Sequence, residues 1–599
     1  MVKNTDYERI NKYPSASVLE TIIRYIPFAL FCAFLLVSPV IPDVKITRPK
    51  LLFIETCLYG AFFLWLATNL YFGKLKFRNS FLNIPVLVYT ASVAVFYLFS
   101  PDKPVALSEL KRSLLSAAAY FTASNLIDTP KKRGMALGLF AAGSFFAIIY
   151  GILQRFGGFW IVQVPQFDRI ASMSGNPIFF AAYLVVAVSV LAGLMFHNKT
   201  TAGKSILAIT FVGGIFAVYF TQTRAAFIGL AVSAAVFLWL TIRSSAKRKT
   251  VFALLIVIAG VFLFLTKNIW QRQQAHTLIW KDTLTMWAAN PVFGTGPGTF
   301  HLYFPKYASP ELKAIWPQER NIVNDAHNEY IQYLSETGVA GFGIFLWLLV
   351  SFFRNALSVK SRITERRDIF LFSGLTAGAS GLLAMNCFSV DMRFIVSAVY
   401  LFAAAGFIDT FGERFYEKRI SFWPLRLFGA VCCLAAGIIA FQMVYEPYRA
   451  QKNLAATPDF FDTSILEPAR TIADLEEIAK KYPGQALVFE KLGWVYSKEK
   501  NWPKAIKNYL QASKLDPASA GPLNNLGNIY FLLGDRSGAI DYWNRSLEIN
   551  PAQVDSRLNL ALAYFYSGKL KESADQLREV LKIDPRNEKA IVMLKQMTE

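Results

Sequence analysis

The chain of 599 residues is more apolar and poorer in charge than a soluble protein of its size. Hydrophobic residues make up 54% of it and charged residues only 17%, whereas soluble domains carry about 25% charged residues. This composition excludes a wholly soluble enzyme and indicates a polytopic membrane protein. The net charge of +21 says little about nucleic acid, because the basic residues are distributed as a membrane topology requires.

A helix needs about 20 mostly apolar residues to cross a bilayer, and thirteen stretches of the sequence approach that length. The fourth and the tenth are the weakest, because they are short or diluted by polar residues. The sequence therefore predicts an all-α membrane domain of 12–13 spans over residues 1–445. The thirteen stretches lie at residues 22–41, 51–72, 81–99, 113–128, 134–154, 178–196, 205–222, 225–242, 250–266, 339–353, 369–388, 394–411 and 422–444.

Lys and Arg are unevenly distributed among the loops that join these stretches. The even-numbered short loops hold about twice as many as the odd-numbered ones. Because cytoplasmic loops carry the basic excess, the even loops and the amino terminus are predicted to be cytoplasmic. The long loop at about 267–338 then lies on the exoplasmic (periplasmic) side of a bacterial inner membrane. With thirteen spans, the carboxy-terminal region lies on that side as well.

The carboxy-terminal region repeats with a period of 34 residues. Gly493, Gly527 and Ala561 share one register, and an aromatic residue follows each of them three positions later. The same period separates the prolines Pro483, Pro517, Pro551 and Pro585. This pattern is the tetratricopeptide signature, whose helix pairs bury their apolar faces by stacking. We expect a linker with a partial repeat at 446–483 and a tetratricopeptide α-solenoid at 484–599, which would bind a protein partner.

The stretch NDAHNEYIQYLSETGVAG, from Asn324 to Gly341, places polar residues directly before a membrane-compatible helix. An ordinary helix start explains its acids and amides, because they satisfy or favour the first backbone N–H groups. It does not explain His327, one of only 4 histidines in the chain. Imidazole can accept a proton near neutral pH, so His327 is either a catalytic base or part of a polar membrane collar.

Arg224 stands in TQTRAAFIGL, between two apolar stretches with almost no loop around it. An ionisable residue at such a place is either functional or extends to the membrane interface. The predicted topology puts Arg224 on the same side as His327. Four further residues share that side: the basic Arg272 and His276 in the long loop, and Arg169 with Asn176 in another exoplasmic loop.

Several cations beside one candidate base suit an anionic lipid pyrophosphate and a hydroxyl acceptor. Guanidinium binds phosphate through two nitrogens and stays charged. The long loop has no Asp-x-Asp pair that would hold a divalent metal, so we expect neither a metal nor a cofactor. The glycines and prolines between 291 and 298 demand tight turns, and their spacing is not that of a dinucleotide-binding motif. Tryptophans beside the basic residues suit a sugar ligand or an interfacial aromatic belt.

Residues 1–445 resemble the O-antigen ligase and polymerase family, which includes bacterial O-oligosaccharyltransferases. The resemblance rests on RIASMSGNPIFFAAYL, TQTRAAFIGL, IWKDTLTMWAANPVFGTGPGTF and AHNEYIQYLSETGVAG. It implies a multi-pass inner-membrane glycosyltransferase that moves a glycan from undecaprenyl pyrophosphate to an acceptor without a metal. By this likeness His327 matches the proposed base and Arg224 the arginine that binds pyrophosphate.

One position departs from the family pattern. Members often carry arginine where His276 stands, and Arg272 lies one helical turn earlier, so either residue is a candidate phosphate contact. The expected reaction is a single, inverting displacement, with Asp325 or Glu329 orienting His327. The remaining candidates for substrate binding are Arg169, Asn176 and Asn328.

Two other classes of function are compatible with this architecture. One is a transporter and the other a non-catalytic scaffold for envelope assembly, each with a tetratricopeptide docking domain. The sequence shows no inverted repeat and no paired broken helices, which are typical of many transporters. The acceptor stays open among lipid A core, a growing polysaccharide and a protein, and so does the choice between ligase and polymerase.

Overall fold

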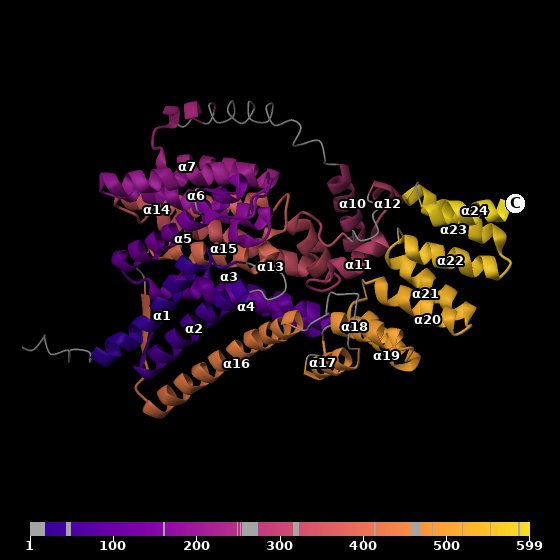
Figure 1. Ribbon diagram of the computed structural model, residues 1–599. Helices are drawn as coiled ribbons and strands as arrows, with labels where there is room; N and C mark the ends of the chain where they lie inside the picture. Colours follow the sequence, from indigo (N-terminus) through magenta and orange to yellow (C-terminus); the bar gives the residue numbers. More distant parts are fainter. Residues whose placement is uncertain are drawn as a thin grey trace, which may run out of the picture.

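The structure, a computed structural model, describes residues 18–598 apart from 43–48, 160–161, 248, 252, 254–273, 316–322, 413–414, 457–467, 482, 485, 518, 552 and 585–586. It is helical almost throughout, which confirms the predicted all-α fold class. Figure 1 shows a bundle of long helices, a cluster of shorter helices at one end of it, and a curved stack of helix pairs beside that cluster.

Twelve helices of the bundle overlap twelve of the predicted spans. Nine of the described helices are long and apolar enough to cross a membrane, and α3 and α15 are apolar but shorter. Most of the remaining predicted span, 250–266, lies outside the described residues. The helices are α1 Val18–Val37, α2 Pro49–Tyr71, α3 Asn83–Phe99, α4 Lys103–Leu126, α5 Pro130–Phe156, α6 Pro177–His197, α7 Thr201–Thr221, α8 Arg224–Thr241, α13 Glu329–Lys360, α14 Arg366–Met385, α15 Ile395–Asp409 and α16 Trp423–Ala456.

Local sequence fixes where several of these helices begin. Three of them start with a polar cap followed by proline, a residue that tolerates the first turn because it lacks an N–H group. Asp102 accepts a hydrogen bond from Val105 N, and Thr129 accepts one from Lys132 N. Asn176 caps α6 in the same way. The caps of α4 and α6 lie on the predicted exoplasmic side, where the candidate residues are, whereas the cap of α5 lies at the opposite end of the bundle.

The centre of the bundle is formed by α6 and α14, which pack on each other and on α8. Of the residues in the apolar, membrane-spanning stretch, 78% are buried in each of α6 and α14, against 11% in α16. The peripheral α16 packs on α2 and continues unbroken past the predicted domain boundary at 445. The opposite end of the bundle from the short helices carries a feature that the sequence did not predict. There β1 (Lys74–Arg78) pairs antiparallel with β4 (Phe415–Arg419).

The tenth predicted span, 339–353, is too short. Helix α13 begins ten residues earlier, at Glu329, with a break at Gly338, whose φ is 61°. The first turns are polar in sequence, but Glu329, Gln332 and Glu336 are all buried. These side chains find partners inside the protein, so a polar segment that resembled a loop is a helix.

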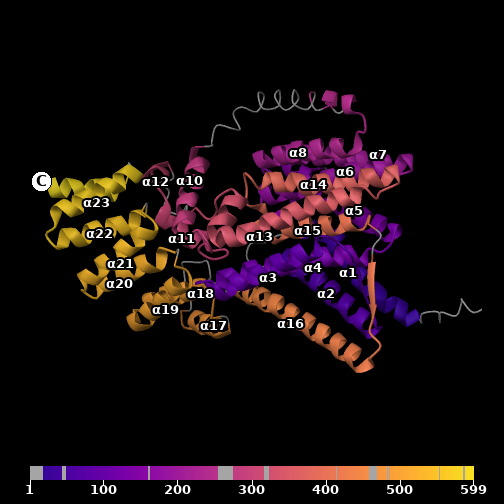
Figure 2. The same cartoon turned by 180° about the vertical axis from the view of Figure 1, so that it is seen from behind.

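The long loop forms three helices with a small core of their own. They are α10 Gln274–Ala289, α11 Phe300–Tyr307 and α12 Pro310–Ile315. Buried Ile279, Met286, Phe300, Phe304 and Leu312 hold them together. Figure 2, from behind, shows the same cluster at the end of α13.

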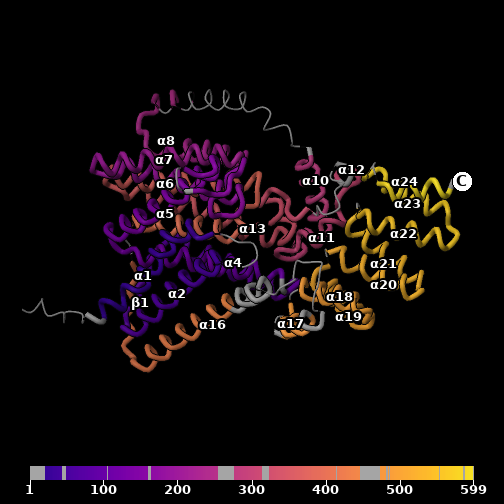
Figure 3. The backbone as a smooth tube through the Cα atoms, viewed as in Figure 1, coloured from indigo at the N-terminus to yellow at the C-terminus, as the bar shows by residue number. Residues whose placement is uncertain are grey.

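The repeats are built as predicted. The three pairs are α18 Ala486–Lys498 with α19 Trp502–Leu515, α20 Gly521–Leu532 with α21 Arg536–Ile549, and α22 Val554–Tyr566 with α23 Leu570–Ile583; α17 Pro468–Lys481 precedes them and α24 Glu588–Thr598 follows. A Cβ on Gly493 would lie 2.7 Å from the Tyr509 ring, which explains the small residue at this register. Figure 3 follows the chain from the bundle through α16 to these pairs, at the same end as α10–α12.

Candidate functional site

His327 lies in a turn that is held from three directions. The backbone N–H of His327 donates to Asp325 Oδ1 (3.0 Å), and the Ala326 N–H donates to Gln332 Oε1 (2.7 Å). From α10, the Trp280 indole N–H donates to the Ala326 carbonyl (2.9 Å). His327 itself has φ of 50°, which is uncommon for a residue with a Cβ. Such backbone strain is typical of functional positions.

Asp325 also contacts the His327 ring. Its Oδ1 lies 3.1 Å from Nδ1, a contact that favours the tautomer with the proton on Nδ1 and leaves Nε2 as the basic nitrogen. Glu329, the other candidate for orienting His327, points elsewhere and lies 3.6 Å from Arg393 Nε. The geometry therefore favours Asp325 as the orienting carboxylate.

His276 of α10 stacks on His327. The ring centroids are 4.5 Å apart and the planes are inclined by 17°. Burial, the largest cause, acts together with the neighbouring His327 and Arg224 to lower the pKa of His276 to about 4, against an opposing effect of Asp325. His276 is therefore neutral near pH 7 and supplies a hydrogen-bonding ring, not a positive charge.

Arg224 is the first residue of α8, directly after a turn in which Gln222 has φ of 52°. The guanidinium is half-buried and close enough to His276 to depress its pKa. Arg169 reaches the same turn, because its Nε donates to the Thr221 carbonyl (3.0 Å). Arg224 and the two histidines are thus brought together from segments about 50 residues apart in sequence, with Arg169 beside them.

Two of the other candidate residues, Asn176 and Asn328, cap helices. Asn176 caps α6, and Asn328 caps α13 by accepting from the Tyr330 and Ile331 N–H groups. Both side chains have a structural role, and their part in substrate binding stays a prediction. Arg272 lies outside the described residues.

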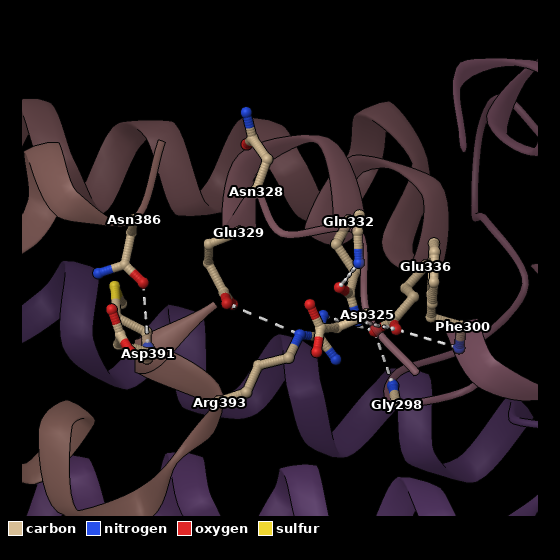
Figure 4. A network of polar contacts seen from close by, with 12 residues as sticks. Gly298, Phe300, Asp325, Asn328, Glu329, Gln332, Glu336, Asn386, Asp391 and Arg393 are labelled. Atoms are coloured by element: carbon tan, nitrogen blue, oxygen red, sulfur yellow. Dashed lines mark hydrogen bonds and ion pairs between the residues drawn. The ribbon is translucent and has the colours of Figure 1, made fainter. Parts of the chain in front are cut away.

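Sequence reasoning missed a buried polar network centred on Glu336, drawn in Figure 4. Glu336 is 1% exposed. Its Oε2 accepts from the Gly298 N–H (2.7 Å) and from Arg393 Nη2 (2.8 Å). Its Oε1 accepts from the Phe300 N–H (3.1 Å). One carboxylate thus joins the loop before α11, helix α13 and the segment between α14 and α15.

The tight turns predicted between 291 and 298 are present, with positive φ at Gly294, Gly296 and Gly298. A Cβ on Gly294 would lie 2.3 Å from the backbone of Glu336, and a Cβ on Gly338 would lie 2.2 Å from the backbone of Val292. The glycine-rich turn is therefore packed directly on the break in α13. Two stretches quoted as separate motifs form one structural unit.

Asp391 is the second residue that sequence reasoning missed. It lies in the short segment between α14 and α15 and is 1% exposed. Burial raises the pKa of Asp391 to about 7; a hydrogen bond from Ser389 opposes this shift, while Glu329 and Asp325 reinforce it. The sequence signal that could have found it is the charged pair Asp391 and Arg393 in a short loop on the predicted exoplasmic side.

No group of three or more His, Cys, Asp or Glu side chains in the described part of the chain could hold a metal ion. Metal independence of the reaction stays a prediction. The site as described offers an oriented imidazole, a second neutral imidazole and a guanidinium. This set can accept a proton and stabilise a negative charge.

Comparison with known proteins gave matches to one stretch of the membrane domain and to the repeats. Residues 208–346 match the family described as O-Antigen ligase, and tetratricopeptide repeat families match residues 493–534, 521–553 and 554–587. A search of curated proteins gave no match.

Solved structures resemble the repeats. One is the first TPR domain of Spaghetti (RPAP3) bound to the HSP90 peptide SRMEEVD, with 26% identity, 19% of this chain and 92% of that chain covered, and a TM-score of 0.18. Another is MamA, with 20% identity, coverage of 25% and 92%, and a TM-score of 0.20. The family matches identify residues 208–346 as an O-antigen ligase domain, joined to carboxy-terminal tetratricopeptide repeats, and this confirms the family and architecture that the sequence motifs predicted.

Proposed function

We propose that this protein transfers a glycan from an undecaprenyl-pyrophosphate donor to a hydroxyl acceptor at the outer face of a bacterial inner membrane. The O-antigen ligase match supports a membrane glycan-transfer role in envelope assembly. The observation that carries the finer proposal is the His327–His276 stack, with Asp325 on the ring of His327 and Arg224 acting on His276.

In the proposed reaction, His327 Nε2 takes the proton from the acceptor hydroxyl as its oxygen attacks the anomeric carbon. Asp325 keeps the ring in the productive tautomer and stabilises the imidazolium that forms. The bond between the anomeric carbon and the pyrophosphate oxygen breaks in the same step, so the anomeric centre inverts.

Arg224 has the electrostatic role. The leaving lipid pyrophosphate gains negative charge, and a guanidinium fixed at the amino end of α8 stabilises that charge without reorganising. The helix end contributes in the same sense, because its N–H groups point toward an anion. Neutral His276 supplies a hydrogen bond to phosphate, and Arg272 is the candidate for a second cation.

The repeats sit where they could present an acceptor or an assembly partner. Helix α16 runs toward the end of the bundle at which α10–α12 lie, and the repeats follow at that same end (Figure 1). If α10–α12 are exoplasmic, the repeats are exoplasmic as well.

The direct test uses the purified full-length protein in lipid nanodiscs with a lipid-linked glycan. We expect undecaprenyl pyrophosphate to be released together with a joined product, and we expect a metal chelator to leave the rate unchanged. A transporter or a scaffold would release no undecaprenyl pyrophosphate under these conditions. Activity that a chelator abolishes and Mg²⁺ or Mn²⁺ restores would contradict the metal-free mechanism.

A further inference from the structure

The turn between α10 and α11 ends in two exposed apolar side chains. Phe293 is 68% exposed and Val292 is 50% exposed. Leu284 on α10, the helix before this turn, is also exposed. Large apolar side chains exposed together on one turn indicate a site of interaction.

Main-chain hydrogen bonds fix the position of this turn relative to α13. The Val339 N–H donates to the Pro291 carbonyl (2.9 Å), and the Ala340 N–H donates to the Val292 carbonyl (3.1 Å). Gly294 is packed against the backbone of Glu336, and Gly338 against the backbone of Val292, so the turn fits on the helix in this one register. Phe293 is therefore held at the height of Val339.

At that height the exposed apolar side of α13 begins. Val339 is the first exposed apolar residue of the helix, and others recur on one face beyond it. They are Leu346, Trp347, Val350 and Phe353. Helical spacing of this kind on a bilayer-spanning helix marks the side that contacts acyl chains.

The neighbouring α3 also has an exposed apolar side, which runs along the length of the helix. Its exposed apolar residues are Ile84, Leu87, Val88, Val95, Leu98 and Phe99. A Cβ on Gly341 of α13 would touch the ring of Phe96, so the two helices are in contact. Figure 2 shows them side by side, with α10 and α11 at their end. Phe293 thus continues a lipid-facing surface that α3 and α13 already form.

We propose that the Pro291–Gly294 turn inserts Val292 and Phe293 among the acyl chains of the leaflet on the α10–α12 side. Continuity with the lipid-facing sides of α3 and α13 identifies lipid as the occupant. Trp287, whose indole N–H donates to the Pro291 carbonyl (3.1 Å), is the amphipathic residue expected at the headgroup level.

Insertion has a consequence for the site, although it does not depend on the proposed reaction. The turn follows α10, which carries His276, and Glu336 clamps the chain directly after it. An anchored turn therefore holds the stacked histidines at the depth of lipid headgroups, where a lipid-linked pyrophosphate lies.

The test attaches an environment-sensitive fluorophore to Phe293→Cys in a full-length protein whose five native cysteines have been replaced. The protein is placed in nanodiscs of phosphatidylcholine, with or without lipid that carries a nitroxide on its acyl chain. Iodide serves as the aqueous quencher. The matched positions are Leu98→Cys on the lipid-facing side of α3 and Lys281→Cys on the exposed side of α10.

We expect the label at 293 to be quenched by the lipid nitroxide as strongly as the label at 98, and several-fold more than the label at 281. Quenching by iodide should show the reverse order. Iodide quenching at 293 equal to that at 281 would place the turn in water and overturn the proposal. Protection from both quenchers, as burial against a second copy or another protein would give, would overturn it as well.

Discussion

The clamp formed by Glu336 makes a quantitative prediction for the loop that carries the site. Replacing Glu336 by Ala leaves the Gly298 and Phe300 N–H groups without the acceptors they have in the structure. Each buried donor left unsatisfied costs about 1–3 kcal/mol. Removing one partner of a buried ion pair costs about 3–5 kcal/mol. Arg393 keeps Glu329 and Glu109 within 3.6 and 3.8 Å, so the cost of losing the Glu336–Arg393 pair lies at the low end of this range.

Together the low ends of these costs give a local loss of about 5 kcal/mol, which corresponds to at least about 1,000-fold more frequent opening of this segment. Hydrogen-exchange mass spectrometry on peptides covering residues 294–303 measures it directly. Glu311→Ala is the matched control, because Glu311 is exposed on α12 of the same loop. Exchange in Glu336→Ala that matches the Glu311 control would refute the clamp. We expect the turnover rate to fall with the loss of protection.

Three further outcomes are expected. Arg224→Lys should lower donor turnover at least about tenfold, because an ammonium cannot reproduce the planar, two-nitrogen contact with phosphate; parental kinetics would place pyrophosphate recognition elsewhere. Asp391, whose folded pKa is raised to about 7, contributes stability that is fully present below about pH 4 and is lost as pH rises to about 7; thermal melting of Asp391→Asn should lose this decline, and an unchanged pH profile would contradict it. Deleting residues 456–599 should spare the membrane fold, because the repeats have their own apolar cores, and should lower acceptor use but not donor binding; loss of donor binding would contradict it.

The sequence predicted the elements whose signal is local. Apolar runs, caps with proline and a 34-residue period depend on neighbouring residues, so the bundle helices and the repeats were predictable. The common side of His327 and Arg224 was also predictable, because charge asymmetry between loops orients every span at once. These features required no knowledge of which helices touch.

Contacts between segments that are distant in the chain could not be predicted from the sequence. Glu336 and Arg393 are 57 residues apart, and β1 pairs with a strand more than 300 residues away. Nothing in the local sequence distinguishes Asp325 from Glu329 as the partner of His327. The choice depends on the positive φ of His327 and on the contact that Glu329 makes with Arg393 instead. The polar start of α13 resembled a loop because its partners could not be seen.

The most direct test of the account is the rate of glycan transfer by His327→Ala in nanodiscs, measured beside His301→Ala. His301 lies in α11 of the same loop and outside the stacked pair, so it controls for loss of an imidazole. Losing a general base typically costs about 10²–10⁴-fold, and we predict a loss in that range for His327→Ala with donor binding retained. Equal rates for the two variants would contradict the assignment of His327 as the base.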